Sequence, residues 1–167
     1  AFNEERVLAA KLDSCLALDY PHDRLQVLVL SDGSTDATNA IAARYAPHGV
    51  QLLAFEQNRG KLTTLRDGLA HATGELLVFS DAATLLAPDS LRRLVRPFAD
   101  TRVGCVSSSY RVVNPAAAEL GHEEGFYWKY ERFLKRCEST LASTLGAHGA
   151  LYAIRRGLFP DLDRDTI

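Results

Sequence analysis

The sequence predicts an α/β fold with a mainly parallel sheet flanked by helices on both faces. Short apolar runs rich in Val and Leu alternate with stretches of helical periodicity, and no hairpin turn signal separates them. Strands that alternate with helices form right-handed βαβ units, which place strands parallel and cover both faces of the sheet. The chain of 167 residues shows neither internal repeats nor a linker composition, so we expect one domain over residues 1–167.

The clearest strand is residues 25–30, a Val- and Leu-rich run that ends in the polar sequence Ser31-Asp32-Gly33-Ser34-Thr35-Asp36. Asp32-Gly33 predicts a turn, and Asp36 predicts an N-cap for the next helix. Further strands are predicted at 50–55, 75–80, 103–110 and 147–154. Helices are predicted at 4–18 with Asn3 as N-cap, then at 37–46, 62–72, 88–98 and 119–145, with a helical turn at 155–159.

The composition is that of an ordinary globular domain, with 47% hydrophobic residues, 24% charged residues and a net charge of −2. This charge balance gives no indication of a nucleic-acid surface. No apolar run approaches the ~18 residues of a membrane span. Cys15, Cys105 and Cys137 lack CxxC spacing, so we expect buried thiols. Because the chain contains no Met, we expect it to be part of a longer polypeptide, truncated at both ends.

Some basic residues stand apart from the apolar pattern. Lys11 is the one polar residue on a helical face that it shares with Val7, Leu8, Leu12, Cys15 and Leu16. The pairs Arg92-Arg93 and Arg155-Arg156 are expected to be solvated or to pair with nearby acids.

Polar clusters follow three of the predicted strands. Asp32 follows the first, Asn58-Arg59-Gly60-Lys61 the second and Asp81 the third. In open α/β sheets ligands bind at the edge where the strands end. A carboxylate there can accept from a sugar hydroxyl or a base N–H, or can hold a divalent cation, and a lysine near a helix N-terminus offsets phosphate charge. Neither GxxxxGK[ST] nor GxGxxG occurs, so the clusters predict a site for a phosphorylated ligand that is neither a P-loop nor a dinucleotide fingerprint.

Five ordered motifs resemble the family-2 glycosyltransferases of GT-A fold, over essentially the whole chain. They are Ala1-Phe2-Asn3-Glu4-Glu5, Ser31-Asp32-Gly33-Ser34-Thr35-Asp36, Asn58-Arg59-Gly60-Lys61, Phe79-Ser80-Asp81-Ala82-Ala83-Thr84 and Gly149-Ala150-Leu151-Tyr152-Ala153-Ile154-Arg155-Arg156. That family transfers a sugar from a nucleotide-sugar donor, usually with inversion.

The resemblance implies roles for seven residues of this chain. Phe2, Asn3 and Glu4 would border the nucleobase pocket, and Asp32 would bind the base or the ribose. Gly60 and Lys61 would lie near the nucleotide. Asp81 would be the first acid of a DxD-type motif and would bind a divalent cation, Mg²⁺ or Mn²⁺.

The sequence departs from the family pattern at three places. The DxD-type motif is Asp81-Ala82-Ala83, so the second carboxylate is missing and a cation would depend on Asp81, diphosphate oxygens and water. The family's first strand would precede Ala1. The catalytic base would lie shortly after Ile167, with Asp165 the candidate inside the chain. We therefore expect the isolated chain to bind donor without turning it over.

The resemblance implies transfer of a hexosyl unit from a nucleoside-diphosphate sugar, a UDP-sugar, to a glycan or lipid-linked acceptor. The expected location is the cytoplasmic face of the inner or plasma membrane, with no nucleic-acid partner and with membrane contacts only in other parts of the protein. One alternative is a cation-dependent α/β binding module, because Asp32-Gly33-Ser34-Thr35-Asp36 approaches a DxSxS loop. A nucleotidyltransferase is the other, and it would need a Gly-rich basic loop after its first strand.

Overall fold

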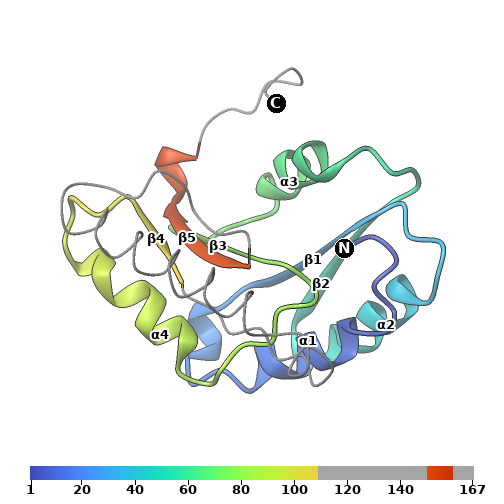
Figure 1. Cartoon of the computed structure of the whole chain (residues 1–167), viewed down its shortest axis with the longest axis horizontal. Helices are drawn as coiled ribbons and strands as arrows, with labels where there is room; N and C mark the ends of the chain where they lie inside the picture. The colour runs from blue at the N-terminus through green and yellow to red at the C-terminus, as the bar shows by residue number, and fades with distance from the viewer. Residues whose placement is uncertain (109–149, 160–167) are drawn as a thin grey trace, which may run out of the picture.

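The computed structural model describes residues 1–108 and 150–159, and the structural statements below concern that part of the chain (Figure 1). The elements in chain order are α1 (Leu8–Leu16), β1 (Val27–Asp32), α2 (Thr38–Arg44), β2 (Val50–Phe55), α3 (Lys61–Leu69), β3 (Leu76–Ser80), α4 (Ser90–Val95), β4 (Cys105–Ser107) and β5 (Leu151–Arg155). A 3₁₀ turn at Arg156–Leu158 matches the predicted helical turn. The predicted helix at 119–145 lies outside the described residues.

The strands form two hydrogen-bonded groups. β1 pairs with β2 in parallel, with Asp32 opposite Phe55. β5 lies between β3 and β4 and is antiparallel to both. Figure 1 shows the strands in the row β4, β5, β3, β1, β2. The α/β class with strands and helices alternating up to β4 is confirmed, but a parallel course for the last strand is not, because an apolar run does not encode its direction.

Helices cover both faces of the row of strands. Figure 1 shows α1, α2 and α4 on one side and α3 on the other. Two apolar clusters fill the side of α1, α2 and α4. The first consists of Leu8, Leu12, Val29, Ile41, Ala42 and Val50, and the second of Leu18, Leu91, Leu94, Phe98, Leu151 and Ala153. The apolar face predicted for the first helix therefore contributes Leu8 and Leu12 to the core.

The N-terminal segment fastens the loop between β1 and α2, and this differs from the expected helix cap. α1 begins at Leu8, and Asn3 has a left-handed φ of 54°. Its Oδ1 accepts the N–H of Thr35 at 2.9 Å, and its N–H donates to Ser34 Oγ at 3.1 Å. The prediction of Asn3 as an N-cap is therefore wrong, because this contact with a distant loop replaces the local one.

Ala1 and Asp36 add further links between these two segments. The N–H group of Ala1 donates to the Leu30 carbonyl, and the Ala1 carbonyl accepts the N–H of Asp32 at 2.9 Å, which is one step of a parallel ladder. The Asp36 carboxylate accepts the N–H of Thr38 at 2.9 Å, as a capping residue does, and the N–H of Glu5 at 3.1 Å.

The predictions for the cysteines and for the paired arginines are confirmed only in part. Cys15 is buried as predicted, but Cys105 is exposed at the start of β4. Arg92 and Arg93 pair with the acids Asp19 and Asp89. Arg155 instead donates to the carbonyl oxygens of Phe98, Asp100 and Val103, so it ties β5 to the α4–β4 connection. Within residues 1–108 and 150–159, no helix is long and apolar enough to cross a membrane.

Candidate active site

Asp32 ends β1 and holds the loop that follows β2. Its side chain is buried, with 6% of its surface exposed. Oδ1 accepts the N–H of Arg59 at 3.0 Å, and Oδ2 accepts the N–H of Gly60 at 2.9 Å. Burial raises the pKa of Asp32, but the hydrogen bonds from the backbone N–H groups of Arg59 and Gly60, the nearby Thr64 hydroxyl and the Arg59 charge together bring the pKa below its ordinary value. Asp32 therefore fixes the start of α3 as an ionised carboxylate.

We predict that Asp32→Asn destabilises the protein by about 1.5–3 kcal/mol at pH 7, the contribution of hydrogen bonds to a charged group. The folded-state pKa is lowered, so the stabilisation is present above the unfolded value of about 3.9 and is lost as the pH falls through the folded value. The difference in the free energy of unfolding between the unmodified protein and the variant should therefore be smaller at pH 3 than at pH 7. Urea unfolding at both pH values measures it, with the exposed Asp23→Asn as the control. An equal deficit at both pH values would show that the charge of Asp32 is not involved.

Lys61 and Asp81 form an ion pair between the start of α3 and the end of β3. The Lys61 Nζ lies 2.9 Å from Asp81 Oδ1, and 69% and 48% of the two side chains are exposed. An exposed pair of this kind contributes about 1 kcal/mol or less, so a ligand can separate it at small cost. Gly60, which precedes Lys61, has a left-handed φ of 88° that turns the chain into the helix. Lys61 and Asp81, which were both predicted as site residues, therefore lie in one exposed polar site.

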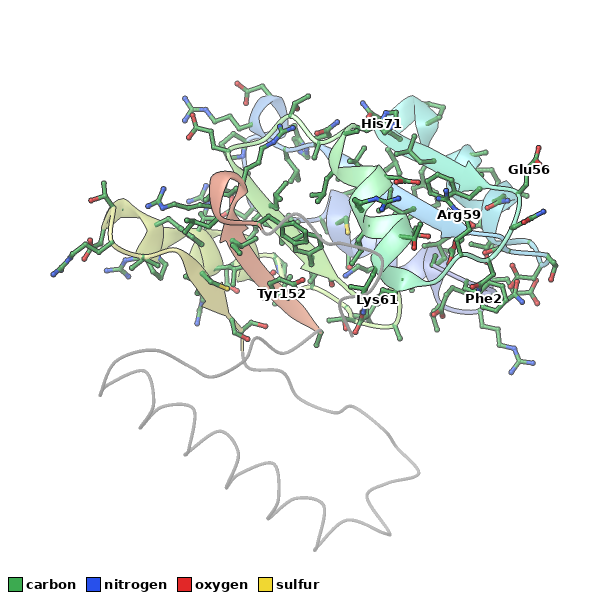
Figure 2. The ribbon with its side chains drawn as sticks, turned by 90° about the horizontal axis from the view of Figure 1, so that it is seen from above. Phe2, Glu56, Arg59, Lys61, His71 and Tyr152 are labelled. Carbon is green, nitrogen blue, oxygen red and sulfur yellow. The ribbon has the colours of Figure 1, made fainter. Side chains whose placement is uncertain are left out.

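Arg59 does not share this site, although it belongs to the same motif. Its guanidinium lies 4.0 Å from the centroid of the Phe55 ring and makes an ion pair of 2.8 Å with Asp67 of α3. Figure 2 shows Arg59 and Lys61, which are two positions apart in the chain, at separate places. Arg59 therefore braces α3 against β2.

The three predicted nucleobase residues lie at the N-terminal segment. Phe2 is 47% exposed, and in the view of Figure 2 Lys61 lies between Phe2 and Tyr152. The side chain of Asn3 is engaged with Thr35, and the Glu4 N–H donates to Thr38 Oγ1 at 2.8 Å. Phe2 thus offers an exposed ring, whereas Asn3 acts on the loop after β1. The nucleobase contacts of these residues stay a prediction.

The donor set for a metal ion is small. In the described part of the chain no group of three or more His, Cys, Asp or Glu side chains is placed to hold a cation. Asp81 supplies one carboxylate, and the exposed Ala83 stands where the second would be. One carboxylate suits a cation that takes its remaining oxygen ligands from a diphosphate and water. Asp165, the candidate base, lies outside the described residues.

Lys11 is a site neighbour to which sequence reasoning gave no role. It is 6% exposed on α1, and its Nζ donates to Ser80 Oγ and to the Thr84 carbonyl, each at 2.6 Å. These two residues flank Asp81. The signal in the sequence was the single lysine in an otherwise apolar helical face, since a buried charge requires partners.

The chain is similar to glycosyltransferases in sequence. The family described as Glycosyl transferase family 2 matches residues 1–162. The dolichyl-phosphate beta-glucosyltransferase of Drosophila melanogaster is 41% identical over 92 residues, which cover 49% of this chain and 28% of that protein. The poly-beta-1,6-N-acetyl-D-glucosamine synthase of Staphylococcus epidermidis is 28% identical over 118 residues, which cover 70% of this chain and 28% of that protein. The chain therefore spans less than a third of either relative.

Solved structures show the same fold. The mannosyltransferase PcManGT from Pyrobaculum calidifontis, in complex with GDP-Man and Mn²⁺, matches with a TM-score of 0.80 and 34% identity, covering 95% of this chain and 43% of that chain. The glucosyl-3-phosphoglycerate synthase from Mycobacterium tuberculosis, in complex with Mn²⁺, UDP-glucose and phosphoglyceric acid, matches with a TM-score of 0.58 and 26% identity, covering 95% of this chain and 55% of that chain.

The alternating strands and helices and the polar site where the strands end define the class, which is the GT-A fold. With the family matched over residues 1–162, the chain belongs to glycosyltransferase family 2. The resemblance of its motifs to that family is thereby confirmed.

Proposed function

We propose that this chain binds the donor in a transferase that moves a hexosyl unit from a nucleoside-diphosphate sugar to a glycan or lipid-linked acceptor, with inversion. The observation that carries the proposal is the ion pair of 2.9 Å between Lys61 and Asp81. It places an ammonium and a carboxylate together at the end of β3, beside the first turn of α3. The donor complexes of the related structures support a nucleotide sugar as ligand.

The arrangement can exchange its internal ion pair for contacts with the donor. When a diphosphate enters, the Lys61 ammonium can turn to the phosphate oxygens, where the N-terminus of α3 also favours negative charge. Asp81 would then be free to hold Mg²⁺ or Mn²⁺. The cation would supply charge compensation for the leaving diphosphate.

Calorimetry tests the proposal through binding of UDP in the presence of Mn²⁺. We expect the whole protein to bind UDP in preference to AMP or NAD, and we include GDP because the related PcManGT structure contains GDP-Man. No UDP binding at millimolar concentration would contradict the UDP assignment. Binding of GDP alone would retain the nucleotide-sugar class and change the base.

Asp32 and Asp36 provide a matched pair of acids in the same loop for that titration. Asp32→Ala should weaken UDP binding more than Asp36→Ala, because Asp32 fixes Arg59 and Gly60 just before Lys61, whereas Asp36 contacts Thr38 and Glu5. Asp36→Ala should lower stability instead, through the loss of a capping contact. Equal effects of the two variants on UDP binding would show that Asp32 has no larger role in the site than Asp36.

We predict that Ala83→Asp tightens Mn²⁺ binding in the nucleotide-free protein. Residue 83 is exposed, so a larger side chain fits, and a second carboxylate would complete the DxD-type pair with Asp81. The unmodified protein should bind Mn²⁺ poorly without UDP and better with it. Metal titration of both forms, each with and without UDP, measures this. Tight Mn²⁺ binding by the unmodified protein without UDP would show that other ligands exist.

An inverting transfer also needs a base that takes the proton from the acceptor hydroxyl. We place this base at or after the C-terminal end of the chain, with Asp165 the candidate inside it. Asp165→Asn in the whole protein tests Asp165 as the base. Sugar transfer should be lost if Asp165 is the base and should be unchanged if it is not.

We assign the protein to the cytoplasmic face of the membrane, where a lipid-linked acceptor would be presented.

The two alternative functions gain no support. A cation-binding module of DxSxS type needs free carboxylates in the loop after β1, but those of Asp32 and Asp36 accept backbone N–H groups. A nucleotidyltransferase is not the family that the sequence matches.

A further inference from the structure

Lys11 is a buried ammonium group that is bound by uncharged partners. Its side chain lies beneath the end of β3 with 6% of its surface exposed, and its two acceptors among residues 1–108 and 150–159, Ser80 Oγ and the Thr84 carbonyl, are neutral. Burial lowers the pKa of Lys11, while Cys15 and, to a smaller extent, Asp81 act to raise it. A buried charge is costly, and an apolar side chain at this buried position would avoid that cost. The position therefore serves something other than packing.

The two acceptors of Lys11 flank the turn that carries Asp81. Ser80 is the last residue of β3, and the Thr84 N–H donates back to the Asp81 carbonyl at 3.1 Å, which closes the turn. Ser80 Oγ also donates to the Ala150 carbonyl at 3.0 Å, just before β5. One ammonium thus fixes both ends of the turn and, through Ser80, its position against β5.

We propose that Lys11 is a positioning residue that sets the place of the Asp81 carboxylate in the nucleotide-sugar site. This inference rests on the proposed function. Because Ala83 stands where a second carboxylate would be, Asp81 is the one carboxylate of this motif that would hold a cation, and a second ligand from the motif could not compensate for a displaced turn. Lys61 reaches the same carboxylate from the exposed side, whereas Lys11 fixes the backbone on its buried side.

The test is Lys11→Met in the whole protein, because Met keeps the length of the side chain and removes the charge. Binding of UDP with Mn²⁺ should weaken about tenfold to hundredfold, the range for hydrogen bonds to a charged group. In an Asp81→Asn background, Lys11→Met should have little further effect, because Lys11 acts through Asp81. Ser14→Ala is the matched control, since Ser14 lies on the same helix and accepts the N–H of Leu86 at 3.2 Å without a charge. It should leave UDP binding unchanged.

Each outcome decides the point. A loss with Lys11→Met that is as large in the Asp81→Asn background, or that Ser14→Ala reproduces, means a general structural role and overturns the proposal. If Lys11→Met does not fold, Ser80→Ala removes one acceptor only, and it should give a smaller loss that also depends on Asp81. Unchanged UDP binding with Ser80→Ala would then overturn the proposal. If the unmodified protein binds neither UDP nor GDP, the proposed function itself fails, whereas normal binding by Lys11→Met defeats only the role of Lys11.

Discussion

Asp81→Asn should reduce sugar transfer by the whole protein by about 100-fold or more, the size of effect seen when one group that stabilises developing charge is removed. Asn keeps the shape of the side chain but loses the charge that pairs with Lys61 at 2.9 Å and that would hold the cation. The loss should appear in kcat as well as in KM, because the charge on the leaving diphosphate grows in the transition state. Steady-state kinetics with a UDP-sugar and Mn²⁺ measure both.

Asp89→Asn is the matched control for that experiment. Asp89 is also a surface carboxylate in an ion pair, with Arg93, but it lies at the start of α4. Its loss should leave transfer unchanged. Full activity of Asp81→Asn would show that Asp81 is not part of the site. It would also show that Asp81-Ala82-Ala83 does not correspond to the DxD-type motif.

Gly33→Ala should lower the free energy of unfolding by about 3 kcal/mol or more, because two separate costs add at this position. Gly33 has a left-handed φ of 72°, which costs other residues about 1–2 kcal/mol. A Cβ at Gly33 would also overlap the backbone nitrogen of Asn58 and lie 2.5 Å from the carbonyl carbon of Gln57. Because both are backbone atoms, the loop after β2 would have to move.

Gly49→Ala separates these two costs. Gly49 has a left-handed φ of 85°, but a Cβ there would meet no atom of the described residues within 4 Å. This variant should therefore lose only the conformational part, about 1–2 kcal/mol. Urea unfolding of both variants, followed by circular dichroism, gives the comparison. Equal losses would mean that the β1–α2 turn does not pack against the β2 loop as closely as described.

The parts of the fold that follow from local pattern could be predicted from the sequence. The strand predicted at 50–55 is β2, and the one at 75–80 is β3 within one residue, because short apolar runs bounded by polar turns identify strands. The start of α1 could not be predicted. Asn3 has the chemistry of a cap, but it is taken by Thr35, 32 positions away. The antiparallel direction of β5 depends in the same way on a distant pairing.

The site shows the same division between local and distant information. Lys61 and Asp81 were each predicted from their place after a strand, and the ion pair between them follows from the meeting of strand ends. Lys11 was visible only as an irregularity in an apolar face. Its function depends on Ser80 and Thr84, which lie 69 and 73 positions away, and no spacing rule connects them.

The position of β5 between β3 and β4 bears on how the chain folds. Gln26 and Gln51, beside the β1–β2 pair, are 25 positions apart, whereas Ser80 and Ala150 at the β3–β5 junction are 70 apart. Pairings between distant residues form slowly, because a long loop must close first. During synthesis β1 and β2 can pair early, but β3 and β4 wait with unpaired edges until β5 emerges. Until β5 is synthesised, the unpaired edge of β4, with its exposed Cys105, can contact other chains. Aggregation therefore competes with folding during this time.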